Sequence, residues 1–157
     1  MKKTNLLKLV IALSLPLAVG AIAGLFSAEA IPAWYASLSQ PSFNPPNWLF
    51  GPVWTILYIT MVISLYLVWK SEPAENRNKA IVIFLIQLTL NFFWSFLFFY
   101  FKNLGLALAE IILLWISIAT IIVTFHKVKP FTAYMNVPYL LWVSFATVLN
   151  AAYFFLN

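Results

Sequence analysis

Five long apolar stretches, separated by short polar or proline-rich segments, make up almost the whole chain. The charge-free part of the first stretch runs from Leu9 to Ala28, which is about the ~20 residues that an α-helix needs to cross ~30 Å of hydrocarbon. The other four stretches are similar in length. The pattern therefore predicts an all-α membrane bundle of five transmembrane helices that forms one domain over residues 1–157, with helices at about 5–26, 46–69, 79–101, 104–125 and 130–155.

The composition agrees with a membrane protein and excludes several kinds of chemistry. Hydrophobic residues make up 64% of the 157 residues and charged residues 8%, with a mean hydropathy of +0.94, whereas soluble domains contain about 25% charged residues. The absence of cysteine excludes disulfides, cysteine nucleophiles and thiolate metal sites, and we expect no metal centre. The basic residues are dispersed at helix ends, so we expect the lipid bilayer, and no nucleic acid, as a partner.

The basic residues fall on one side of the predicted bundle. Five spans place the N-terminus and the turns at 70–79 and 126–130 on one side, and the C-terminus and the 102–105 turn on the other. Eight of the nine lysines and arginines lie on the first side, and only Lys102 lies on the second. By the positive-inside rule, we expect an integral multi-pass protein with a cytoplasmic N-terminus and a C-terminus outside.

The first apolar stretch has an alternative interpretation. Its basic start and the sequence Ala28-Glu29-Ala30 resemble a secretory signal peptide with its cleavage site, although the apolar run exceeds the ~7–15 residues of a usual signal core. We expect this stretch to remain as a helix. Gly20 and Gly24 are four residues apart, and small residues at this spacing serve either packing within the chain or a homodimer interface. The sequence leaves both uses open.

The segment from Trp34 to Trp54 differs from the rest of the chain, because it contains six aromatic residues and four of the nine prolines. Prolines lack a backbone N–H and disfavour helix at the preceding residue. We therefore expect a rigid, extended connector over residues 27–45 that covers the end of the bundle. Pro52 lies in the first turns of the second helix, where it should kink or loosen that helix.

Aromatic and polar positions inside three of the predicted helices recur at four-residue spacing, so each set shares one helix face. Amide side chains that faced lipid would lose their hydrogen bonds to water, so the polar sets should face the bundle interior. These faces predict an aromatic pocket with a few amides. For most of the residues on them, the alternative role is packing between helices. The sets are Trp54 and Tyr58; Gln87, Asn91 and Ser95; and Trp142, Ala146 and Asn150.

Two further ionisable residues could carry chemistry and are considered separately. Glu110 is about a turn and a half inside the fourth helix, so we expect its carboxylate to reach the headgroup layer, with a buried carboxylate as the alternative. His126 is the single histidine and should lie in a solvated loop. The chain offers no Ser/His/Asp set, no paired carboxylates and no phosphate-binding glycine loop. A conventional hydrolase, a transferase and a proton pump are therefore not expected.

Three blocks of sequence resemble the TspO/MBR family, the tryptophan-rich sensory proteins and translocator proteins that include the peripheral benzodiazepine receptor. The run from Trp34 to Tyr58 matches the family's Trp-Tyr-x-x-Leu-x-x-Pro-x-Phe-x-Pro-Pro-x-Trp-x-x-Gly-Pro-Val-Trp-x-x-Leu-Tyr signature. Residues 87–94 and 138–150 agree as well. The resemblance implies a five-helix fold with the ligand beneath the first extramembrane loop.

The resemblance also implies ligands and residues that bind them. Members of the family bind tetrapyrroles such as protoporphyrin IX, and mammalian members also bind cholesterol and benzodiazepine-site ligands. Trp54 and Trp142 match tryptophans associated with light-dependent porphyrin breakdown, which would make them catalytic. Two positions depart from the family, since no basic residue follows Tyr153, which weakens the sterol pattern, and Val62 replaces a common glycine. The ligand-binding positions carried over are Trp34, Pro45, Trp48, Trp54, Asn91, Trp94, Trp142 and Ala146.

These observations favour a receptor or sensor that binds protoporphyrin IX, haem or another flat hydrophobic molecule, with no obligatory cofactor. Tyr58 joins the predicted site because it shares a face with Trp54. The alternatives are an enzyme of porphyrin photo-oxidation and a porphyrin or sterol transporter. The sequence offers no coupling residues for transport.

Overall fold

The structure, a computed structural model, describes residues 3–72 and 74–157. In these residues the chain contains five helical segments that are long and apolar enough to span a membrane, which confirms the predicted all-α bundle. The bounds of the elements are α1 Lys3–Ala30, η1 Ile31–Tyr35, η2 Asn47–Leu49, α2 Phe50–Lys70, α3 Glu75–Ser95, η3 Phe96–Tyr100, α4 Leu104–Val128, α5 Pro130–Met135 and α6 Val137–Leu156.

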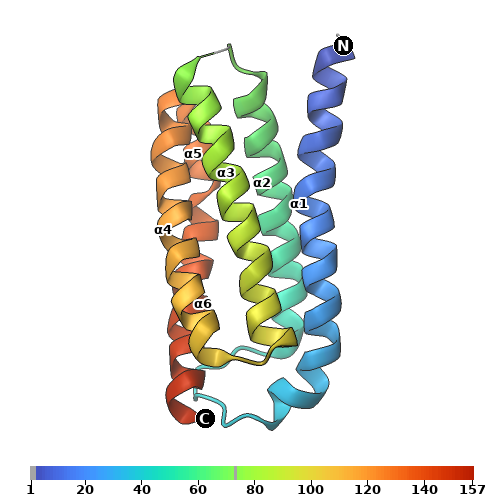
Figure 1. The fold of residues 1–157 in the computed structure, drawn as a ribbon, viewed down its shortest axis with the longest axis vertical. Coiled ribbons are helices and arrows are strands. Elements are labelled where there is room, and N and C mark those ends of the chain that lie inside the picture. The colour runs from blue at the N-terminus through green and yellow to red at the C-terminus, as the bar shows by residue number, and fades with distance from the viewer. Residues whose placement is uncertain (1–2, 73) are drawn as a thin grey trace.

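Consecutive spans run in opposite directions, so the two ends of the chain lie at opposite ends of the bundle (Figure 1). The α2–α3 and α4–α5 turns lie at the N-terminal end of the bundle, and the connector between η1 and η2 and the η3–α4 turn lie at the C-terminal end. Helix α4 packs against α3 and α6, and α1 packs mainly along α2. This arrangement leaves α1 at the edge of the bundle.

The first helix is longer than expected and the connector is shorter. We expected a helix over about 5–26 and a connector over 27–45, but α1 continues to Ala30 and one wide π-helical turn extends it to Tyr35. Ala28, Glu29 and Ala30 favour helix, and no glycine or proline lies between Gly24 and Pro32. Pro32 lies inside this continuous helical run, where its ring and missing N–H disfavour the regular α-helical hydrogen bond, and the chain there forms the wider π-helical turn.

Prolines shape two of the other spans. The second span opens with a 3₁₀ turn, η2, before α2 starts at Phe50, and Pro52 lies in the first α-helical turn. The last span, expected as one helix over 130–155 that Pro138 bends or weakens, divides at Asn136 into α5 and α6. Pro138 stands in the first turn of α6, and Asn136 is buried with its Nδ2 donating to the carbonyl of Thr132 at 2.8 Å.

Gly20 lets α1 approach α2 closely. An added Cβ at position 20 would lie 2.8 Å from Cδ2 and Cε2 of the Tyr58 ring, whereas a Cβ at Gly24 would meet no atom within 4 Å. Of the two uses that the sequence left open for this glycine pair, Gly20 serves packing within the chain.

Replacing Gly20 with alanine should destabilise the α1–α2 contact. The hydroxyl of Tyr58 donates to Asn91, so the ring cannot easily move away, and overpacking costs about 1–3 kcal/mol. Thermal unfolding in detergent, followed by circular dichroism, should show a lower Tm for Gly20→Ala. Gly24→Ala is the matched control and should unfold like the wild type. Equal Tm values for the wild type and Gly20→Ala would contradict the close approach.

Candidate functional site

A cavity of about 480 Å³ opens inside the half of the bundle that lies next to the connector. Its walls come from α1, η1, η2, the start of α2, the end of α3, η3 and α6, while α4 and α5 contribute no lining residue. The volume lies within the ~300–1,000 Å³ typical of small-molecule sites. Most of the large side chains in the walls are aromatic, and they are Tyr35, Phe50, Trp54, Tyr58, Trp94, Phe98, Phe99 and Trp142.

Helical spacing brings these rings together. Trp54 and Tyr58 are one turn apart on α2, with ring centroids 5.8 Å apart, and Trp94 of α3 lies 6.3 Å from Trp54. Trp142 and Ala146 are one turn apart on α6, and the small Ala146 side chain leaves space between its larger neighbours. Because most polar groups behind these rings are hydrogen-bonded to each other, the cavity presents ring faces and edges to a guest.

A buried hydrogen-bond network supports one wall of the cavity. The Tyr58 hydroxyl donates to Oδ1 of Asn91, and Nδ2 of Asn91 donates to the Tyr139 hydroxyl at 2.9 Å. That hydroxyl in turn donates to Oε1 of Gln87 at 3.0 Å. Gln87 and Asn91 are 0% and 1% exposed, which confirms that the amides of α3 face the interior.

A second set of polar contacts fixes the tryptophan of α3. Nε1 of Trp94 donates to Oδ1 of Asn150 at 3.2 Å, and Nδ2 of Asn150 donates to the carbonyl of Leu104 at 3.0 Å. These bonds join α3, α6 and the start of α4. They hold the Trp94 ring against the cavity, so its position does not depend on a ligand.

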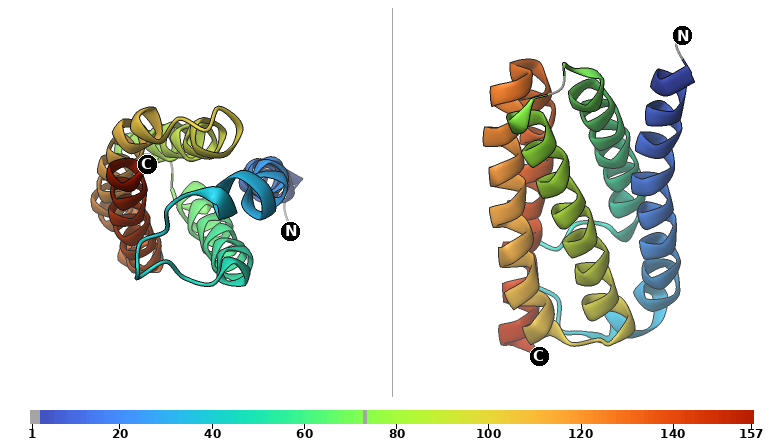
Figure 2. Two further views of the ribbon diagram at one scale, coloured as in Figure 1. Left: turned by 90° about the horizontal axis from the view of Figure 1, so that it is seen from below. Right: turned by 45° about the horizontal axis from the view of Figure 1, so that its top comes forward.

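Hydrogen bonds attach the connector to η1 and to the C-terminal residue of the chain. The Tyr35 hydroxyl donates to Oδ1 of Asn44 at 2.7 Å. The backbone of Ser39 exchanges two hydrogen bonds with the side chain of Asn157, at 2.8 and 3.1 Å. Figure 2 shows in its left panel that the connector crosses the end of the bundle. The connector therefore covers the end of the bundle nearest the cavity.

Comparison with known proteins agrees with this architecture. The family model described as "TspO/MBR family" matches residues 12–156. The chain belongs to the TspO/MBR family. It is 42% identical over 154 residues to the tryptophan-rich protein TspO of Archaeoglobus fulgidus, covering 98% of this chain and 99% of the relative. It is 41% identical over 154 residues to the Chlorobaculum tepidum protein of the same name, covering 98% of each chain. The human translocator protein is 41% identical over 120 residues, which cover 74% of this chain and 70% of the relative.

The structure brings together five of the residues that the sequence and the TspO/MBR resemblance suggested. Trp54, Tyr58, Trp94, Trp142 and Ala146 all line the cavity. They come from three helices, and all except Trp94, which only the family resemblance suggested, lie on the faces that the four-residue spacing predicted. Their role in ligand binding stays a prediction.

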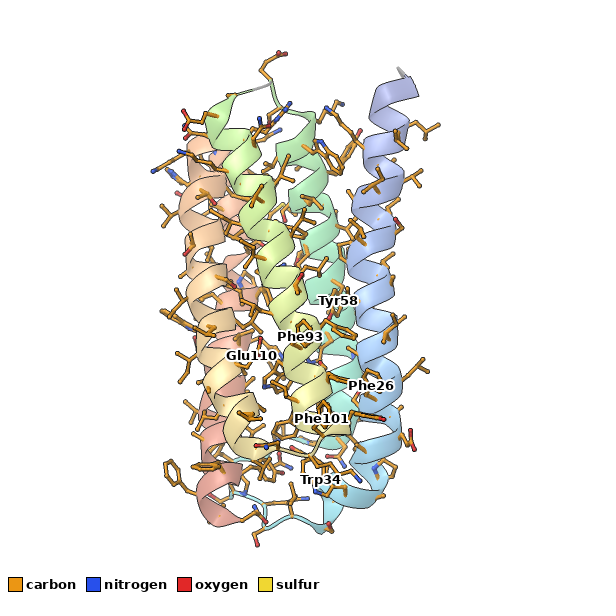
Figure 3. All side chains as sticks on the ribbon, viewed as in Figure 1. Phe26, Trp34, Tyr58, Phe93, Phe101 and Glu110 are labelled. Atoms are coloured by element: carbon orange, nitrogen blue, oxygen red, sulfur yellow. The ribbon has the colours of Figure 1, made fainter. Side chains whose placement is uncertain are left out.

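Four other suggested residues do not line the cavity. Asn91 is buried behind Tyr58. The rings of Trp34 and Phe98 pack edge to face with their centroids 5.7 Å apart, and Figure 3 shows Trp34 at the connector end of the bundle. Pro45 is half-buried in the connector, and Trp48 is 71% exposed. These side chains would reach a guest only through movement of the connector or through the residues that they support.

The sequence did not identify α1 as a wall of the site. Gly20, Gly24, Ser27 and Ala28 line the cavity, together with Ile31 of η1. Gly24 and Ala28 are also exposed, as are Gly51 and Thr55 on the facing part of α2, so the cavity is open to the surface between α1 and α2. The signal was the spacing of small residues on α1, which also fits simple helix packing.

Glu110 is buried, although its position near the start of α4 led us to expect that its carboxylate would reach the headgroup layer. It is 8% exposed, and neither carboxylate oxygen has a hydrogen-bond partner among the described residues. The reason is rotational, because the face of α4 that carries Glu110 also carries Ala107, Ile111 and Leu114, all buried against the rest of the bundle. His126 is exposed in the last turn of α4, at the other end of the bundle from the cavity.

Proposed function

We propose that this chain is a membrane receptor or sensor that binds tetrapyrroles in the cavity between α1, α2, α3 and α6. The observation that carries the proposal is the convergence of Trp54, Trp94 and Trp142 on one cavity. Flat aromatic molecules gain from burial and from ring contacts of about 0.5–1.5 kcal/mol beyond burial. The names of relatives, tryptophan-rich sensory protein and translocator protein, fit a sensor or translocator role in a membrane.

The polar groups of the cavity suggest how such a guest would be oriented. Nε1 of Trp142 is buried and has no acceptor among the described residues, so it can donate to a carboxylate of a porphyrin. The described lining contains no histidine, cysteine or methionine. We therefore expect recognition of the porphyrin ring itself, so that metal-free protoporphyrin IX binds at least as tightly as haem.

A spectroscopic titration tests this proposal. Purified protein in detergent should bind protoporphyrin IX saturably in the dark, with quenching of tryptophan fluorescence in parallel with the change in porphyrin absorbance. Haem titrated in the same way tests the expectation that no metal is needed. A linear, unsaturable response that equals that of empty detergent micelles would reject the proposal.

A sterol is a weaker candidate than a tetrapyrrole. Tyr153, the residue of the sterol-recognition pattern, is 0% exposed and its ring centroid lies 4.9 Å from that of Tyr35. It faces the interior of the bundle, so it does not present its hydroxyl to a sterol on the lipid side. This placement adds to the missing basic residue after Tyr153.

A second candidate function is light-dependent breakdown of the bound porphyrin. The observation that favours it is that Trp54 and Trp142, from α2 and α6, line the same cavity. Indole is more easily oxidised than phenyl, so either ring could supply an electron to a porphyrin excited by light. Dioxygen would be the oxidant consumed.

We further propose a cytoplasmic N-terminus and a connector that faces outward. Eight of nine basic residues occur in the N-terminal segment and the turns at that end. A reporter that is active only outside the cytoplasm should therefore be active when fused after Asn157. The same reporter inserted in the turn between α2 and α3 should be inactive. Activity only from the turn fusion would reverse the orientation.

A further inference from the structure

The cavity has no complete wall on the side where α1 packs along the start of α2. Four of its lining residues on this side are exposed at the surface of the bundle, and they are Gly24 and Ala28 of α1 and Gly51 and Thr55 of α2. A Cβ atom added at Gly24 or Gly51 would meet no atom of a neighbouring element within 4 Å among the described residues, so both glycines border open space. We call the opening between these four residues the lateral window.

The lateral window ends where α1 closes onto α2. One turn before Gly24, a Cβ atom added at Gly20 would lie 2.8 Å from the ring of Tyr58. Tyr58 is buried, and its hydroxyl donates to Asn91, so the ring is fixed in this place. The close contact seals the seam between the two helices toward the N-terminal end of the bundle. The window therefore occupies the half of the seam that lies next to the connector.

The surface of the window is apolar. Its α1 residues belong to the charge-free run that ends at Ala28, so we place them in the hydrocarbon layer. The hydroxyl of Ser27, which also lines the cavity, donates to the carbonyl of Gly24 at 3.0 Å, and the hydroxyl of Thr55 donates to the carbonyl of Gly51 at 2.9 Å. Because each hydroxyl is bonded within its own helix, an apolar molecule that passes leaves no polar group newly unpaired.

The end of the cavity beneath the connector is closed by contacts. Tyr35 lines the cavity there and is 2% exposed, with its ring centroid 4.9 Å from that of Tyr153. Its hydroxyl donates to Asn44 of the connector, and Ser39 of the connector exchanges two hydrogen bonds with Asn157. A guest that entered from water at this end would have to break these contacts. Entry through the lateral window breaks none of them.

We propose that the lateral window is the entrance of the cavity, and that it admits flat apolar molecules dissolved in the bilayer without passage through water. Because a porphyrin is taken as the guest, this entrance rests on the function proposed above. Transfer of apolar surface out of water is favourable, so such a molecule is concentrated in the hydrocarbon beside the window rather than in the water beside the connector. Glycine and alanine at the window leave the gap through which a ring passes edge first.

Leucine side chains at the window test the entrance. Neither Gly24 nor Gly51 has a positive φ, and both border open space, so leucine fits at both positions. Binding of protoporphyrin IX to protein in phosphatidylcholine vesicles is followed in the dark by quenching of tryptophan fluorescence. The slope of the observed rate against the porphyrin-to-lipid ratio gives the association rate, and the intercept gives the release rate.

In the double variant Gly24→Leu, Gly51→Leu, we expect both the association rate and the release rate to fall by roughly tenfold or more. A side chain that only took space from the guest would weaken binding and would not slow release. Unchanged or faster release in the double variant would therefore overturn the entrance. Ala18→Leu is the matched control, since Ala18 is an exposed residue of α1 outside the described lining of the cavity. It should keep wild-type rates, and equal slowing in this control would also count against the window.

The connector provides an independent test of the route. Asn157→Ala removes both hydrogen bonds to Ser39. Entry at the lateral window predicts wild-type rates for this variant, whereas faster association and release would place the entrance beneath the connector. This measurement decides the question even if the leucine variants do not fold. A wild-type protein that does not bind protoporphyrin IX saturably would reject the proposed function and the entrance with it. Saturable binding with wild-type rates in the double variant would overturn the entrance alone.

Discussion

Replacing Ala146 with phenylalanine should lower the affinity for protoporphyrin IX by roughly 5- to 150-fold. Ala146 is 8% exposed and lines the cavity between Trp142, one turn before it, and Asn150, one turn after it. A phenyl ring at this position would occupy the space that a flat guest needs. Forcing both groups into the cavity would cost about 1–3 kcal/mol, and that energy corresponds to the stated range in affinity. The measurement is a porphyrin titration in the dark.

Val148 provides a matched control for the Ala146 variant. It lies two residues further along α6 and is 59% exposed on the outside of the bundle. Val148→Phe adds a ring of the same size to the same helix without entering the cavity, so its affinity for protoporphyrin IX should equal that of the wild type. Equal affinities for Ala146→Phe and wild type would place the binding site outside this cavity.

The spans were predictable from the sequence because a bilayer imposes a length and a composition on each helix. The ends of the spans were less predictable. The first helix continues past the apolar run to Ala30, because alanine and glutamate favour helix whether or not they lie in hydrocarbon. The break at Asn136 depends on the local proline and on a buried amide contact, which apolar periodicity does not report.

The sequence could identify the cavity residues that recur at four-residue spacing along one face of a helix. Trp54, Tyr58, Trp142 and Ala146 stand on faces with regular four-residue spacing, and the faces turned out to point inward. The contribution of α1 was not predictable, because the spacing of small residues such as Gly24 and Ala28 fits simple helix packing equally well. Their contribution is the space that they leave between α1 and α2.

Glu110 shows why depth along a helix is a weaker guide than rotation about it. Its distance from the start of α4 would allow a long side chain to reach the surface. Its two neighbours at four-residue spacing differ in exposure, since Leu106 is 57% exposed and Leu114 is 0% exposed. The side chain of Glu110 therefore lies at the edge of the buried face, and only the packing of α3 and α6 against α4 decides its environment.

Conversion of Trp54 or Trp142 to phenylalanine should separate binding from chemistry. Trp54→Phe keeps an aromatic ring beside Tyr58 and Trp94, so it should lose only about 1 kcal/mol of stacking, which is several-fold in affinity. Trp142→Phe loses in addition an N–H whose hydrogen bond to a guest would contribute about 0.5–1.5 kcal/mol. Both variants should still bind protoporphyrin IX when it is supplied in excess over its Kd.

Light should then distinguish the two functions. If breakdown passes an electron from an indole to the excited porphyrin, with dioxygen as the oxidant, each variant loaded to the same occupancy should lose its light-dependent bleaching of porphyrin absorbance. Trp115→Phe is the control, because Trp115 lies outside the cavity and donates to Ser144 at 2.7 Å on the outer side of α4 and α6. It should bleach like the wild type. Equal bleaching rates in the wild type and all three variants would exclude a reaction that depends on Trp54 or Trp142.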